Sequence, residues 1–111
     1  MTMALIGIEG GAGKIEQGAE AASLIARSLE AYTKGNIDAL YALGVAFSTA
    51  SHGCSCDMIE AHKWFNIAAS KGHEEAAWCR ADVSDEMTAR EIAEAQRRAR
   101  EWLADGQRKV A

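Results

Sequence analysis

YALGVAFSTASHGCSCDMIEAHKWFNIAASKGHEEA, residues 41–76, carries the clearest helical pattern in the chain. Its apolar residues recur three or four positions apart on both sides of a polar loop, which is the spacing of one face of an α-helix. The first half predicts a helix with Leu43, Gly44 and Phe47 on one face. The second half predicts another helix, ended by Gly72. Its apolar seam is formed by Ala61, Trp64, Phe65, Ala68 and Ala69. The stretch therefore predicts an antiparallel helical hairpin.

Glycines and capping residues set the expected limits of the helices. The pattern predicts about five helices, over residues 14–34, 37–49, 57–71, 73–84 and 88–106. Gly35 is expected to end the first helix, and Asn36 is expected to cap the second by accepting a backbone N–H bond. Gly106 is expected to end the fifth.

Two pairs of residues have the spacing of a capping box, in which a side chain at the helix start and one three residues later each bond the other's backbone. Asp57 with Glu60 is an acidic variant of this pattern and predicts the start of the third helix. Thr88 with Glu91 has the usual composition and predicts the start of the fifth.

The chain contains an internal repeat. KGNIDA at residues 34–39 recurs as KGHEEA at residues 71–76, an offset of 37 residues that is typical of stacked helical hairpins. Arg80 and Ala81 replace the Leu-Gly pair of the first copy, so the second copy is degenerate and resembles a terminal, capping unit.

Length and composition predict one folded domain. The 111 residues are 49% hydrophobic and 25% charged and contain no proline, which suits packed helices. Residues 1–13 are rich in glycine and are expected to form a flexible N-terminal arm, with the helical domain over residues 14–111. The net charge of −4 disfavours binding to nucleic acid, and we expect no such partner.

The cysteine count and the N-terminus predict a cytoplasmic protein. Three cysteines without framework spacing are better explained as reduced thiols than as disulfides of a secreted domain. The N-terminal apolar run is too short for a signal sequence or a membrane helix, and no membrane partner is expected.

The hairpin resembles the Sel-one-like repeat, a relative of the tetratricopeptide repeat. The residues that match its pattern are Ala39, Leu43, Gly44, Asp57, Ala61, Trp64, Phe65, Ala68, Ala69, Gly72 and Ala76, with Phe47 at the place of a tyrosine. The resemblance covers one repeat of about 40 residues. It implies an all-α fold, an antiparallel helical hairpin stack of the tetratricopeptide-like α-α superhelix type. It also implies a noncatalytic protein-protein interaction module or adaptor whose partner is another protein or peptide.

The fourth helix is the expected inner lining of a curved repeat, and partner-binding residues are predicted there and on the second helix. They are Tyr41, Val45 and Trp78. A homodimer is also predicted, because one full repeat between two partial ones leaves apolar surface uncovered. Its contacts are expected at Leu24 and Ala31, which lie off the main apolar stripe of the first helix, and in the arm at Leu5, Ile6 and Ile8. A purely structural homodimer is one alternative function.

A small metal- or thiol-based sensor is the other alternative. It would use the loop residues His52, Cys54 and Cys56, joined by His62 or Cys79. The Cys-x-Cys spacing is tighter than that of usual zinc sites, so we expect no metal and no cofactor. Replacing both loop cysteines with serine is accordingly expected to leave stability unchanged. Without an evident acid–base set, no catalytic residue is predicted and the protein is not expected to be an enzyme.

Overall fold

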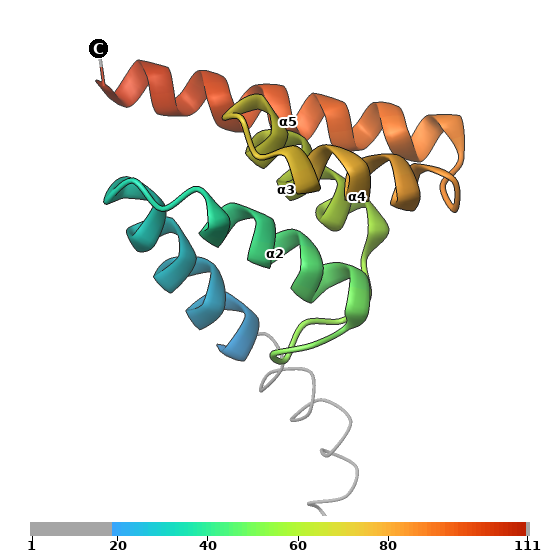
Figure 1. Cartoon of the computed structure of the whole chain (residues 1–111), viewed down its shortest axis with the longest axis horizontal. Helices are drawn as coiled ribbons and strands as arrows, with labels where there is room; N and C mark the ends of the chain where they lie inside the picture. The colour runs from blue at the N-terminus through green and yellow to red at the C-terminus, as the bar shows by residue number, and fades with distance from the viewer. Residues whose placement is uncertain (1–18, 111) are drawn as a thin grey trace, which may run out of the picture.

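The computed structural model describes residues 19–110, with side chains as far as residue 106, and every regular element in this range is an α-helix (Figure 1). A first helix is described over residues 19–33. It is followed by α2 (Asp38–Thr49), α3 (Met58–Ser70), α4 (Glu74–Ser84) and α5 (Ala89–Val110). The five helices confirm the predicted all-α stack of helical hairpins. The arm of residues 1–13 lies outside the described part of the chain.

The central element is α3, which packs against α2, α4 and α5. Figure 1 shows the first helix lying beside α2, and α5 running along the opposite side of the stack. The buried core holds the residues predicted from the hairpin pattern, namely Leu43, Gly44, Phe47, Ala61, Trp64, Phe65 and Ala68. Because α3 has neighbours on three sides, Ile67 and His62 are buried as well.

The internal repeat is visible in the backbone of two turns, residues 31–36 and 68–73. In each turn the glycine has a positive φ, 97° at Gly35 and 101° at Gly72, a conformation that favours glycine. In each turn the residue after the glycine donates its amide to the carbonyl five residues earlier. In each turn the glycine and the residue before it also donate their amides to the carbonyls three residues earlier. An offset of 37 residues therefore repeats the geometry of the turn as well as its sequence.

The expected cap of α2 by Asn36 is wrong. The residue at the N-cap position is Ile37, which has no side-chain acceptor, and the start of α2 has no side-chain cap. Asn36 lies one residue too early, and its own amide bonds back into the turn. At the matching position of the second copy, His73 does cap a helix, since its Nδ1 accepts the amide of Ala76 at 3.1 Å.

The two predicted capping boxes differ. Thr88 and Glu91 form a complete box, with each side chain bonded to the other's amide at 2.9 and 3.1 Å. Asp57 caps α3 by accepting the amides of Ile59 and Glu60, both at 3.1 Å. Glu60 does not bond back, because the amide of Asp57 already donates to the carbonyl of Phe47.

The expected end of the fifth helix at Gly106 is also wrong, since α5 continues to Val110. A glycine inside a helix costs only about 1 kcal/mol relative to alanine, which neighbouring helical residues can offset. A helix end would have required a left-handed residue, and Gly106 is not among the positive-φ glycines.

The buried face of the first helix differs from the predicted stripe. Helical spacing predicts a stripe that includes Ala22, Ile25, Ala26, Leu29 and Tyr32. Ile25, Leu29 and Tyr32 do pack against the core, but Ala22 and Ala26 are exposed, whereas Leu24 packs against the core and Ser28 is buried. Leu24, which was predicted to lie off that stripe, therefore packs inward in part, and its contact in a dimer stays a prediction. Leucine gains more from burial than alanine does, which explains why the helix turns this side inward. Ala31, the other predicted contact, is half-buried.

No described helix is both long and apolar enough to cross a membrane.

Candidate functional site

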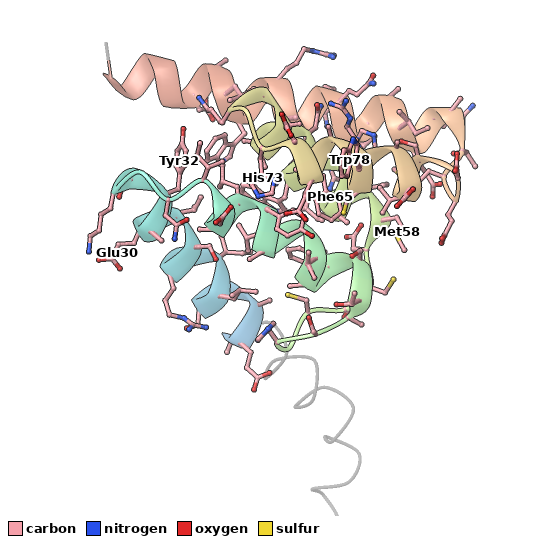
Figure 2. The ribbon with its side chains drawn as sticks, in the orientation of Figure 1. Glu30, Tyr32, Met58, Phe65, His73 and Trp78 are labelled. Atoms are coloured by element: carbon pink, nitrogen blue, oxygen red, sulfur yellow. The ribbon has the colours of Figure 1, made fainter. Side chains whose placement is uncertain are left out.

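Trp78 is the large hydrophobic side chain that α4 leaves in solvent. It is 69% exposed, and no other large hydrophobic residue of the described chain is classed as exposed. Glu74, Glu75 and Asp82 lie three or four residues away on the same helix and are exposed too. Figure 2 shows Trp78 on the α4 side of the stack, far from Glu30 at the end of the first helix. The side chain of Trp78 is thus accessible to a partner, as the prediction of a partner-binding residue requires.

Tyr41, on α2, is half-buried where α2 meets α4. Its ring stacks on the imidazole of His73, with centroids 4.5 Å apart and planes 14° apart. Its hydroxyl lies 3.9 Å from the thiol of Cys79 on α4. The hydrogen bond with Cys79, followed by burial, raises the pKa of Tyr41. Of the three predicted partner-binding residues, Tyr41 therefore also forms part of the joint between two helices.

Val45 lies one helical turn after Tyr41. It is half-buried and packs against the core, and its carbonyl accepts the hydroxyls of Ser48 and Thr49. Its side chain offers less exposed surface than Trp78, so Trp78 is the dominant apolar feature of this part of the molecule. We call the surface formed by Trp78 and the neighbouring acidic residues Glu74, Glu75, Asp82 and Asp85 the Trp78 face.

An acid–histidine pair lies beside the Trp78 face, between Asp38 and His73. The Nε2 of His73 is 2.9 Å from a carboxylate oxygen of Asp38, 35 residues away in the chain. Because Nδ1 accepts the amide of Ala76, Nε2 carries the proton and donates it to Asp38. Both ring nitrogens are therefore occupied, and the imidazole has no atom left to act as a general base. This pair joins the start of α4 to the start of α2.

The loop that carries His52, Cys54 and Cys56 does not bring these side chains into one site. Cys54 is buried at 3% exposure and belongs to the core, whereas His52 and Cys56 are exposed. The thiol of Cys56 lies 3.9 Å from the carbonyl of Ser48. Within residues 19–110, no group of three or more His, Cys, Asp or Glu side chains is arranged to hold a metal ion. The sensor alternative gains no support from this geometry.

Burial of Cys54 also corrects the expected effect of replacing it. Desolvation raises the pKa of its thiol, so the group is neutral in the folded protein. Serine at this position would place a hydroxyl in the apolar core, which costs free energy unless a hydrogen bond forms. We therefore keep the expectation of unchanged stability for Cys56 alone, because that side chain is exposed.

The arginines near the middle of α5 form ion pairs with glutamates instead of an open basic surface. Arg98 bridges from Glu94 at 2.7 Å to Glu60 on α3 at 2.8 Å. Arg97 pairs with Glu94 and with Glu101 at 2.7 and 2.6 Å. Hydrogen bonds from Arg97 and then Arg98 hold the pKa of Glu94 at about 2. The charge of these two arginines is thus offset within the chain.

His62 is a buried polar residue whose role could not be read from the pattern. It is 2% exposed, and its Nδ1 has no hydrogen-bond partner among the described residues. Burial, and secondarily the charge of Arg80, lowers the pKa of its imidazole from the usual 6.5. The folded protein therefore keeps His62 neutral at a pH where the unfolded chain would protonate it.

We expect this difference to make stability fall with decreasing pH. Between a pH of about 6.5 and the lower pKa of the folded state, the unfolded chain binds a proton that the folded chain does not. The free energy of unfolding should decrease by up to about 1.4 kcal/mol per pH unit in that window. Urea unfolding at several pH values measures the slope. The variant His62→Leu should flatten it and should be at least as stable as wild type above pH 7, because no hydrogen bond of Nδ1 is lost. Identical slopes in both proteins would contradict the assignment.

A scan against protein-family models, a search of curated proteins and a search of solved structures each give no match for this chain.

Proposed function

We propose that this protein is a noncatalytic protein-interaction module, similar to a Sel-one-like repeat, whose partner is another protein or a peptide. The observation that carries the proposal is the exposure of Trp78. A tryptophan gains a large free energy when its ring leaves water, and tryptophan is enriched among residues that dominate protein interfaces.

The chemistry of the neighbouring side chains supports a binding role over catalysis. His73 uses both ring nitrogens in structural hydrogen bonds, with Asp38 and Ala76. The thiol of Cys79 faces the hydroxyl of Tyr41 instead of a base. Three cysteines outside any disulfide are compatible with the reducing cytoplasm, where we propose that the protein acts.

Selection from a random peptide library tests the proposal directly. The immobilised protein should retain peptides that the variant Trp78→Ala does not retain. Trp78 is exposed, so the variant should fold, which circular dichroism would verify. The control variant Trp78→Phe should retain part of the binding, because it keeps an aromatic ring. Recovery of the same peptides by wild type and by Trp78→Ala, or of none by either, would overturn the proposal.

A further inference from the structure

Trp78 and Tyr41 occupy equivalent positions in the internal repeat, since they are 37 residues apart. In the first copy the next hairpin covers this position: α4 and its cap bring His73 and Cys79 onto the ring of Tyr41. In the second copy α5 is the counterpart of α3 and packs against α3, so it does not take the place on Trp78 that α4 takes on Tyr41. Trp78 is left 69% exposed. The repeat thus indicates what kind of element fits over Trp78, namely a helix placed as α4 is placed on Tyr41.

The charged residues around Trp78 indicate which charge a helix bound there would carry. With 100° between successive residues of an α-helix, Glu74, Glu75, Asp82 and Asp85 all lie within about 60° of Trp78 around the axis of α4. All four are exposed. Residues 74–86 contain five acidic residues and one basic residue, a net charge of −4.

The single base of this segment does not neutralise the Trp78 face. Arg80 lies about 160° from Trp78 around the helix, on the side that faces α3. Its guanidinium donates to the side-chain oxygen of Asn66 on α3 at 2.8 Å. On α2, the neighbouring charge is a further carboxylate, that of Asp38, which is 82% exposed and paired with His73. The Trp78 face is therefore negative, with an aromatic ring at its centre.

We infer that the Trp78 face binds a positively charged helix of a partner protein, with a lysine or arginine of that helix over the Trp78 ring. A cation over an indole ring is attracted by the ring's electrons, and arginine also stacks on it. Carboxylates on both sides would hold further basic residues one helical turn away. This inference rests on the proposed function and adds the chemistry of the partner.

Fluorescence anisotropy with three labelled peptides of about 18 residues, enough for about five helical turns, tests it. The first peptide is helix-forming and built from Ala, Leu, Lys and Arg; the second replaces every Lys and Arg with Glu; the third is the basic peptide with two central prolines. We expect binding of the first alone, weakened by added salt because the attraction is between charges.

Two variants of the Trp78 face and one matched control locate the binding. Glu75→Lys should weaken the basic peptide about tenfold or more, and Trp78→Ala about tenfold. Glu30→Lys makes the same change in net charge on the first helix, where Glu30 is exposed and pairs with Lys34, and it should change affinity less than twofold. Equal loss with Glu30→Lys would show attraction to the net charge alone and would overturn the inference, as would equal binding of the proline peptide.

The outcomes separate this inference from the proposed function. Peptides selected from the random library that need Trp78 but carry no basic residues would leave the interaction module standing and overturn the charge of its partner. A second copy of the chain is the other possible occupant. A concentration-dependent mass in sedimentation that Trp78→Ala abolishes would show self-association through the Trp78 face and would overturn the binding of a separate partner.

Discussion

Replacing Trp64 with alanine is expected to lower the free energy of unfolding by about 3–5 kcal/mol. Trp64 is 2% exposed, so the substitution would remove a side chain whose surface is almost entirely buried in the core. The ring of Trp102 on α5 packs edge-on against it, with centroids 5.6 Å apart. The ammonium of Lys63 lies over its ring, 4.3 Å from the centroid. A domain of this size has only about 5–15 kcal/mol of stability, so the loss would be a large part of the total.

Urea unfolding followed by circular dichroism measures this loss as a lower midpoint at an unchanged slope. The matched control is Trp64→Phe. The indole Nε1 has no hydrogen-bond partner among the described residues, so phenylalanine removes volume without breaking a hydrogen bond. It should cost about 1–2 kcal/mol. A Trp64→Ala midpoint equal to that of wild type would show that the α3–α5 contact does not stabilise the fold.

The second large effect is expected at Gly44, where α2 and α3 approach closely. A Cβ at this position would overlap the ring of Phe65, whose Cγ lies 2.9 Å away and whose edge lies closer still. The ring is 1% exposed and has little room to move. Gly44→Ala should therefore destabilise the protein by about 2–3 kcal/mol, even though alanine favours a helix by about 1 kcal/mol.

Gly106→Ala is the matched control for this substitution. Gly106 also lies inside a helix, but nothing is within 4 Å of the position its Cβ would occupy. Alanine there should stabilise the protein by up to about 1 kcal/mol. A double-mutant cycle with Phe65→Leu should show coupling of more than about 1 kcal/mol between residues 44 and 65. Effects of the same sign at Gly44 and Gly106 would contradict the steric explanation.

Helix limits could be predicted where glycine and capping residues mark them. Gly35 and Gly72 end helices as expected, and α2, α3 and α4 agree with the prediction to within a residue or two. The errors arise where the local signal is ambiguous. Gly106 has no left-handed conformation to enforce an end, and the first helix contains so many alanines that two different faces fit the helical period.

The candidate site was predictable only in part. Trp78 was predicted to be accessible because α4 was expected to line the inside of a curved repeat, and its side chain is exposed. The pairing of Asp38 with His73 joins residues 35 positions apart and has no local signature. His62 became a core residue because three helices surround α3, whereas the sequence indicates one apolar seam. Long-range contacts of this kind depend on how the helices assemble, which the spacing of apolar residues does not encode.

The matching turns at residues 31–36 and 68–73 bear on how such a chain can grow. Because both turns have the same backbone hydrogen bonds, the polypeptide leaves the first helix and α3 in the same local direction. If residues 36–72 were duplicated in tandem, each copy would be joined to the next by a turn of this same geometry. No new type of turn would be needed. The segment between the two glycines can therefore act as a single repeat unit, and the fold can lengthen by duplication of this unit.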